Sequence, residues 1–254
     1  MRKSWLAALP ALLFAAACSD PTSSADQVAV TVAFATSDAG GTQSNGQLVL
    51  TGTNGTLAID ELRVIVDRFE LKRTEDDACV EEDHSCERFR APPLFIDVPL
   101  TGASTVAIEQ AVEPGTYRRL KFEIEDLEDD DDTPTRAAEI AQLLSSVRAQ
   151  FPEWPREASM QVRGTFTPNG GTPQAFTTYF EAEVDIRMDL VPPVTIVDDG
   201  DGAKFTVVLD PALWFRFGDG TVRDLSALDF SRTGVAEEFE IEIENGFAEI
   251  EFED

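Results

Sequence analysis

The chain has 254 residues, 43% of them hydrophobic, and its 48 acidic against 20 basic side chains give a formal net charge of −28. This apolar content is enough for a substantial core, which excludes a disordered polyanion, and the length allows one large all-β domain or two small ones. A charge of this size repels phosphate backbones and anionic lipid surfaces. The composition therefore predicts no nucleic-acid partner and favours divalent cations and basic partners.

Residues 1–17 have the pattern of a bacterial lipoprotein signal peptide. Arg2 and Lys3 precede an apolar run that is too short for a permanent membrane-spanning helix, and Cys18 follows three alanines. The segment resembles a bacterial lipobox, except that Ala15 stands where leucine is usual. We expect Cys18 to become a lipid-bearing N-terminus that anchors the protein in the cell envelope, with the outer membrane favoured. An ordinary secretory signal, cut without lipid, is the alternative.

Beyond a polar, flexible tether at 18–27, the apolar residues recur with the period of two that is typical of strands. The first strand is expected from Val28 to Phe34, and a loop at 40–46 follows. Asn54-Gly55 then predicts the two-residue turn of a hairpin. This hairpin and the strands after it are expected at 47–53, 56–59, 62–71, 94–100, 105–109 and 119–125.

Cys79 and Cys86 lie in an acidic segment between two of these strands. In an oxidising compartment their spacing predicts a disulfide that pinches a hairpin loop. The alternative is a metal site that uses both thiolates and His84, the only histidine of the chain. Such a site would need at least one more ligand.

One segment has the period of a helix. After the acidic run Asp129–Asp132, Thr133 and Pro134 supply a cap and a first helical position, and apolar residues recur at helical spacing as far as Phe151. We expect an amphipathic helix at 134–151 that covers a sheet opening or edge and packs its apolar stripe into the core. The aspartates before it are expected to be solvated.

The second half returns to strands, at 160–166, 176–188 and 205–209, with an aromatic cluster at 214–217. In the long strand 176–188 the even-numbered residues share one face, and Tyr179 with the charged residues shares a wet face. The tail is expected to form a hairpin that turns at Asn245-Gly246. Its glutamates would share one face, which needs water, salt or a cation. Those glutamates are Glu238, Glu240, Glu242, Glu244, Glu249, Glu251 and Glu253.

Together these patterns predict a mostly β chain, an antiparallel β-sandwich with one amphipathic helix at 134–151. The sandwich region is expected to cover residues 28–254. A division into two sub-domains near 126–158 stays open.

Three stretches carry a resemblance to a known family: Leu62–Leu71, the Pro114-Gly115-Thr116-Tyr117 turn into Arg119–Phe122, and Val207–Asp210. They resemble the DUF4382-type domains of bacterial surface lipoproteins. The turn is also similar to that of transthyretin-like and carbohydrate-binding β-sandwiches. The resemblance covers residues 28–217 and implies a sandwich on the cell surface or in the periplasm. It transfers no catalytic residue.

The sequence contains no nucleophile with a histidine base in a known arrangement, no phosphate-binding loop and no dinucleotide fingerprint, so no enzyme is predicted. A glycosidase that uses paired carboxylates is a less favoured alternative. Asp198, Asp199 and Asp201, with glycines between and after them, are weak candidates for a calcium site. The competing interpretation is an acidic surface turn, and no other cofactor is expected.

These observations favour a non-catalytic envelope module that binds a carbohydrate or a protein, because exposed loops on a rigid sandwich are a common place for recognition. The alternative is a structural or calcium-binding acidic envelope protein. The N-terminal lipid would attach the protein to the membrane.

Overall fold

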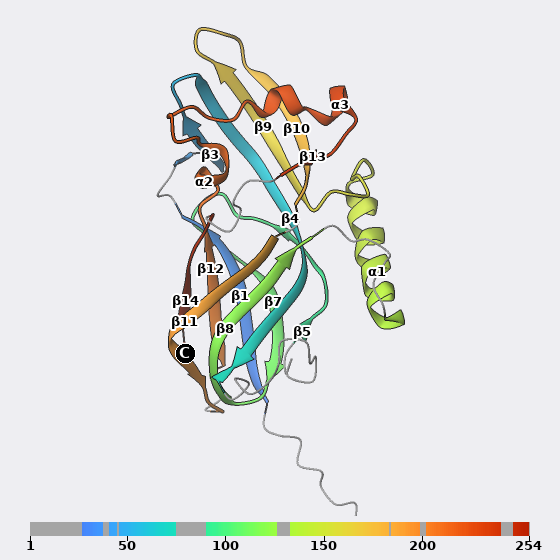
Figure 1. The fold of residues 1–254 in the computed structure, drawn as a ribbon, viewed down its shortest axis with the longest axis vertical. Coiled ribbons are helices and arrows are strands. Elements are labelled where there is room, and N and C mark those ends of the chain that lie inside the picture. Colours follow the sequence, from blue (N-terminus) through green and yellow to red (C-terminus); the bar gives the residue numbers. More distant parts are fainter. Residues whose placement is uncertain are drawn as a thin grey trace, which may run out of the picture.

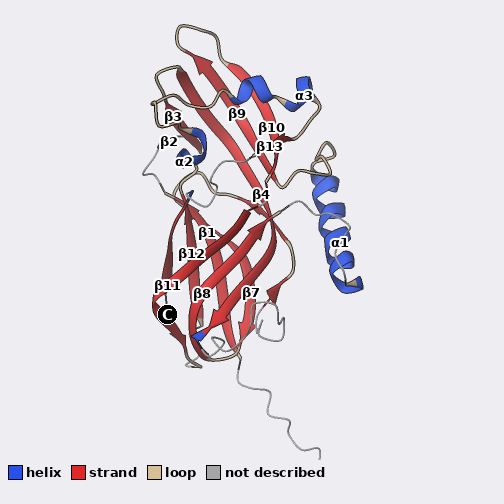
Figure 2. Ribbon diagram, viewed as in Figure 1, coloured by secondary structure: helices blue, strands red, loops and turns tan. Residues whose placement is uncertain are grey.

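The fold is known from a computed structural model, which describes residues 27–37, 41–44, 46–74, 90–125, 133–182, 184–198, 202–239 and 246–253 (Figure 1). Strands dominate these residues and helices are few (Figure 2). The predicted mostly β class is therefore confirmed.

The strands of the described residues are β1 (Val28–Thr36), β2 (Thr42–Ser44), β3 (Gln47–Thr51), β4 (Gly55–Arg73), β5 (Arg90–Ala91), β6 (Leu94–Asp97), β7 (Ser104–Val112), β8 (Gly115–Ile124), β9 (Met160–Pro168), β10 (Gln174–Glu181), β11 (Val184–Ile196), β12 (Ala203–Leu209), β13 (Glu237–Glu238) and β14 (Phe247–Glu253). The helices are α1 (Pro134–Gln150), α2 (Ala212–Phe215), the 3-10 turn η3 (Leu225–Leu228) and α3 (Phe230–Thr233).

Within the described residues these strands form two sheets. The smaller sheet has the order β14-β12-β1-β7, and the larger sheet has the main order β11-β8-β4-β9-β10-β13. The short strands β3, β5 and β6 also pair with β4, and β2 pairs with β3. The pairs β1–β12 and β10–β13 are parallel, whereas the other pairs are antiparallel, so both sheets are mixed.

The strand β4 joins the two ends of the molecule. Its first half pairs with β3 and β9, and its second half pairs with β8 (Figure 1). At the β8 end the smaller sheet packs against the larger one. The ring of Phe122 on β8 lies 5.8 Å from that of Phe34 on β1 and 4.9 Å from that of Phe247 on β14. One apolar core thus joins the inner faces of both sheets, which is the arrangement of a sandwich.

The hairpin β3–β4 forms as expected, but its turn lies one residue earlier than predicted. The Gly52 N–H donates to the Gly55 carbonyl at 2.8 Å, so the central residues are Thr53 and Asn54. The side chain of Asn54 bonds both the N–H and the carbonyl of Val222, at 2.9 and 2.8 Å. A tertiary contact of Asn54 therefore accompanies the shifted turn.

The single long strand predicted at 176–188 is wrong, because the chain changes neighbours there. β10 pairs with β9 and β13, whereas β11 pairs with β8. Between them the buried Ser159 hydroxyl accepts from the Ala182 N–H at 2.8 Å and lies 2.9 Å from the Ala182 carbonyl. This side chain satisfies backbone groups that a continuous strand would have used.

Two smaller expectations also need correction. The predicted loop at 40–46 contains β2. Most of the first arm of the predicted tail hairpin, with Asn245 of its turn, lies outside the described residues, so that hairpin stays a prediction; among the described parts of the tail, β13 pairs with β10 and β14 pairs with β12. Tyr179, expected on a wet face, is 3% exposed. Residues 126–132 lie outside the described residues, and a division into sub-domains there stays a prediction.

The helix α1 matches its prediction in start and buried face, and it ends at Gln150, one residue before the predicted end. It begins at Pro134, the Thr133 hydroxyl accepts from the Arg136 N–H, and Ile140, Leu144 and Val147 are buried. These side chains form a second core with Ile65 of β4, Phe95 of β6, Tyr179 of β10, and Trp154 and Ala158 of the segment between α1 and β9. The helix thereby covers the outer face of the larger sheet, and Tyr179 is buried in this second core against the rings of Trp154 and Phe230.

Candidate functional site

Most of the residues singled out in the sequence lie outside the described part of the chain. These are Cys18, Cys79, His84, Cys86, Asp199 and Asp201. Asp198 is described and is exposed just beyond β11. The lipid anchor, the disulfide and the calcium loop therefore stay predictions.

Three carboxylates that the sequence did not single out converge where β4 and β8 pair. One oxygen from each of Asp67, Glu123 and Glu125 lies within 4.8 Å of the others. The pairing of β4 with β8 creates this cluster, since Asp67 lies more than fifty positions before Glu123 and Glu125 in the chain. The composition alone, with 48 acids, gave no signal for it.

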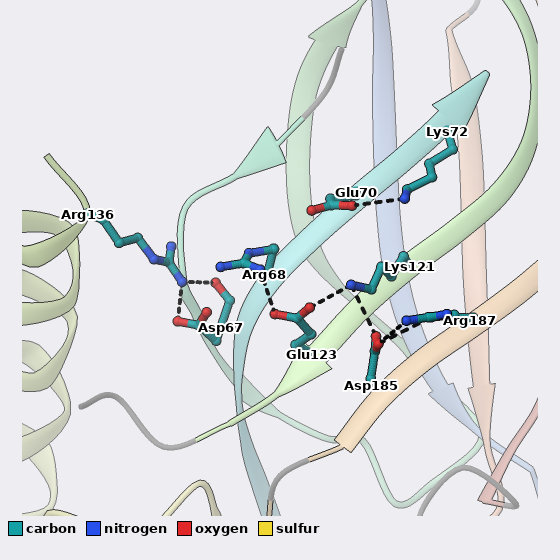
Figure 3. Close-up of polar contacts among 9 residues, drawn as sticks. All are labelled: Asp67, Arg68, Glu70, Lys72, Lys121, Glu123, Arg136, Asp185 and Arg187. Carbon is teal, nitrogen blue, oxygen red and sulfur yellow. Dashed lines mark hydrogen bonds and ion pairs between the residues drawn. The ribbon is translucent and has the colours of Figure 1, made fainter. Parts of the chain in front are cut away.

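Cations lie around Asp67 and Glu123 of this cluster (Figure 3). The guanidinium of Arg136 on α1 bonds the Asp67 carboxylate, and both side chains are almost fully buried. Burial raises the pKa of Asp67 above its ordinary value, against the attraction of Arg136. The other ion pairs are Arg68–Glu123 at 3.2 Å, Lys121–Glu123 at 2.7 Å, Lys121–Asp185 at 3.4 Å and Arg187–Asp185 at 2.7 Å.

These cations stand where a metal ion would otherwise balance the carboxylates. The arrangement fits a structural network that fastens α1 and β8 to β4, and we assign no metal to it. The charges of the network alternate in sign from Arg136 through Lys121 to Arg187 (Figure 3).

A groove of about 850 Å³ lies between β11 and β14. β11 is the last strand of the larger sheet and β14 the last strand of the smaller sheet, so the groove marks the seam where both sheets end. Both strands lie at the same side of the molecule (Figure 1). The lining comprises Arg187, Met188, Asp189, Leu190, Val191, Pro192, Pro193, Val194 and Thr195 of β11 with Phe247, Ile250 and Phe252 of β14.

The sequence of β11 explains why the seam is open. The pairing of β11 with β8 is interrupted between Asp189 and Val194, where the strand has a bulge. Pro192 and Pro193 have no N–H to donate to a ladder, so prolines of this kind stand at sheet edges and bulges. Val191 beside them is 88% exposed. The bulge leaves part of the core surface uncovered.

The wall contributed by β14 is apolar and its outer face is acidic. Ile250 and Phe252 lie opposite Val207 and Phe205 of β12, and the two phenylalanine rings are 5.1 Å apart. Glu251 and Glu253 alternate with them and are exposed. The groove therefore has an apolar wall beside a negatively charged surface.

The rim on β11 carries charges that are already paired. Arg119 of β8 donates to the Asp189 carboxylate at 2.6 Å. This hydrogen bond holds the pKa of Asp189 below its ordinary value. Asp189 therefore contributes to the lining of the groove as a carboxylate that is paired with Arg119.

Sequence reasoning missed this groove, although one signal was present. Two consecutive prolines in an otherwise alternating strand indicate an edge strand with an interruption. That β14 stands across from this interruption depends on the topology of both sheets, which no local pattern specifies.

In the part of the chain that the structure describes, the fold and the groove define a mostly β protein, a sandwich with a groove between β11 and β14. Within the described residues, no helix is both long enough and apolar enough to cross a membrane.

No family model matches the chain, and no curated protein matches it. Among solved structures it is similar to MbnP from Methylosinus trichosporium, with 15% sequence identity, a TM-score of 0.34, and coverage of 72% of this chain and 75% of that chain. The resemblance to DUF4382-type domains stays a prediction.

Proposed function

We propose that this protein is a non-catalytic binding module of the bacterial envelope, and that its groove between β11 and β14 holds a segment of a protein partner. The groove itself is the observation that supports this function. It combines a volume of about 850 Å³, an apolar floor and a charged rim, which are the usual properties of a binding site.

The aromatic residues favour a protein over a carbohydrate as the partner. Sugar rings commonly stack on exposed tryptophan or tyrosine rings. The chain has three tryptophans and two tyrosines, and Trp154, Trp214, Tyr117 and Tyr179 are each no more than 3% exposed. The remaining one, Trp5, falls in the predicted signal peptide.

The carboxylates favour binding over glycoside hydrolysis. A glycosidase needs two carboxyl groups that flank an open substrate cleft, one of them protonated. Burial raises the pKa of Asp67, but this carboxyl is 5% exposed, is bonded to Arg136 and does not line the groove. Glu123 is paired with Arg68 and Lys121.

The membrane contact of the proposed module rests on Cys18. A lipidated N-terminus carries more than one acyl chain, whereas a single chain binds a membrane only marginally. We expect Cys18→Ser to abolish labelling by a radioactive or clickable fatty acid and to move the protein from the membrane fraction to the soluble fraction. Unchanged labelling of this variant would refute the lipoprotein hypothesis.

The groove function can be tested with a random-peptide library and a glycan array, both applied to the full mature chain. Thr195→Trp places a large side chain at an exposed position of the groove wall. Val106→Trp is the matched control, because Val106 is 50% exposed on β7, at the opposite edge of the smaller sheet.

We expect peptides that bind the parent and Val106→Trp but not Thr195→Trp. Peptides that bind all three proteins equally would contradict a role for the groove. Glycan binding that Thr195→Trp abolishes would replace the protein partner with a carbohydrate.

A further inference from the structure

We infer that the occupant of the groove is an extended segment that adds as a strand to the open edge of β14, with apolar residues alternating with lysine or arginine. This inference rests on the proposed function and specifies its partner and mode of binding. It follows from the pairing of β14, the prolines of β11 and the charges on the outer face of β14.

The first observation is an edge of β14 with which no described strand pairs. In the described part of the chain β14 pairs with β12 alone, from Phe247 to Glu253, and it ends the smaller sheet. An edge strand presents a row of N–H and carbonyl groups that can pair with a further strand. The stretch of seven residues contains no proline that would interrupt such pairing.

The second observation decides which side of the groove is used. Across from β14, β11 carries Pro192 and Pro193, which have no N–H to donate, at the bulge in its pairing with β8. These features protect an edge against strand addition. An incoming segment would therefore bond its main chain to β14, whereas β11 would contribute apolar side chains such as Met188 and Val194.

The third observation sets the sequence of the segment. Residues of an added strand alternate between the two faces of the sheet. Those on the inner face would meet Ile250 and Phe252, which line the groove. Those on the outer face would lie beside Glu251 and Glu253, where opposite charges stabilise a cross-strand pair and like charges destabilise it.

The existing neighbour of β14 already follows this rule. On β12, Lys204 stands opposite Glu253 and its ammonium lies 2.8 Å from the carboxylate. The formal net charge of −28 would also attract a basic segment over longer distances. A second copy of this chain fits poorly, because pairing β14 with its own copy would bring glutamates together.

The test uses four fluorescent heptapeptides and the full mature chain. The first alternates lysine with valine, and the second alternates glutamate with valine. The third and fourth are lysine–valine peptides that are N-methylated at alternate residues, in opposite phases. A strand bonded along one edge uses only alternate N–H groups, so one phase removes the donors that face β14 and the other phase removes those that face away.

We expect the lysine–valine peptide to bind, and the glutamate–valine peptide to bind at least about tenfold more weakly. We expect one N-methylated phase to weaken binding by about tenfold or more and the other to bind like the parent peptide. The double variant Glu251→Lys/Glu253→Lys changes two exposed side chains and should reverse the charge preference.

The outcomes separate this inference from the proposed function. Equal binding of both N-methylated peptides, still blocked by Thr195→Trp, would overturn strand addition and leave the groove as the binding site. Peptide binding that Thr195→Trp does not change would overturn the proposed function of the groove itself. A fatty acid that binds in the groove, where no lysine–valine peptide binds, would identify a lipid tail as the occupant and overturn the inference.

Discussion

Gly164 occupies the middle of β9, where a glycine normally weakens a strand. It lies opposite Ile59 of β4, next to a shift in register between Ile59 and Glu61. A Cβ atom at this position would overlap the carbonyl oxygen of Ala58. The glycine is therefore required by the close approach of two backbones, although its φ angle is not in the left-handed region.

Gly164→Ala is expected to lower the free energy of unfolding by about 1–3 kcal/mol, because the backbone must shift to make room. Urea denaturation of the purified protein measures this change. Gly218→Ala is the control, since a Cβ at Gly218 would meet no heavy atom within 4 Å. The control should change stability by less than about 0.5 kcal/mol. Equal effects of the two substitutions would contradict the steric explanation.

Glu61 gives a pH dependence whose sign follows from its neighbours. Arg63 and Arg163 lie 2.6 and 3.2 Å from its carboxylate. Burial alone would raise the pKa of Glu61, but the two guanidinium groups outweigh burial and hold the pKa below the ordinary 4.5. The unfolded chain therefore takes up this proton more readily than the folded protein. The stabilisation is present above about pH 4.5 and is lost as the pH falls through the lower, folded-state pKa.

Glu61→Gln should reduce the fall in unfolding free energy between about pH 6 and pH 3, because the variant has no carboxylate to protonate there. Urea midpoints at a series of pH values measure it. Glu109→Gln, at an exposed position of β7, is the control and should keep the parent's pH profile. If Glu61→Gln also keeps that profile, the ion pairs of Glu61 do not contribute to acid stability.

At the scale of elements, α1 is fastened to the larger sheet by apolar packing and by one buried ion pair. Val147 and Ile140 pack against the side chain of Ile65 and its neighbours. The guanidinium of Arg136 also bonds both the carboxylate and the backbone carbonyl of Asp67. A buried ion pair contributes little more to stability than an apolar pair of similar size. Removing one partner, however, leaves the other charge buried and unpaired.

Arg136→Met is expected to lower the free energy of unfolding by about 3–5 kcal/mol at neutral pH. The double variant Arg136→Met/Asp67→Leu should lose less than the single variant, since it removes the stranded carboxylate. Urea unfolding followed by far-UV circular dichroism tests both. At acidic pH the loss of unfolding free energy caused by Arg136→Met should become smaller, because burial raises the pKa of Asp67 and favours its neutral form. A double variant less stable than Arg136→Met would contradict this account.

At the scale of the whole molecule, the net charge of −28 opposes folding by self-repulsion. Salt should raise the melting temperature by screening, and sodium and calcium salts at equal ionic strength should then act alike. A specific site at Asp198, Asp199 and Asp201 would add a further shift of several degrees with calcium, because the ion would bind the native state preferentially.

Differential scanning calorimetry in matched NaCl and CaCl₂ distinguishes screening from a site. Asp199→Asn/Asp201→Asn should abolish any extra effect of calcium if these side chains bind the ion, and should leave the effect of sodium almost unchanged. Equal stabilisation by both salts, in parent and variant alike, would indicate that Asp198, Asp199 and Asp201 belong to a solvated acidic turn and not to a calcium site.

Much of the fold could be predicted because its signals are local. Alternating apolar residues predicted β1, β8, β9 and β12, and Thr133-Pro134 with the helical spacing up to Phe151 predicted α1. The burial of Tyr179 could not be predicted in the same way. Its neighbours in sequence indicate an exposed face, and the cover comes from Trp154 and Phe230, whose rings lie 5.3 and 5.0 Å from it.

The candidate site was the least predictable feature. The alternation in the tail predicted a strand at Ala248–Phe252, and Pro192-Pro193 marked an interrupted edge. Neither pattern indicates that these two segments lie side by side. The groove exists because both strands end their sheets on the same side of the sandwich. The cluster of Asp67, Glu123 and Glu125 likewise depends on the pairing of β4 with β8.

The sequence by itself determined the β class, the helix α1 and the acidic character. Strand alternation and helix capping depend on residues close together in the chain, and the net charge is the sum over all side chains. Only the tertiary structure decided where strands break, turn and meet. Asn54 bonds a residue 168 positions away, and Ser159 bonds the backbone at which β10 gives way to β11. Such contacts depend on which distant segments the packing of the core brings together, and the pattern of a single segment does not contain that information.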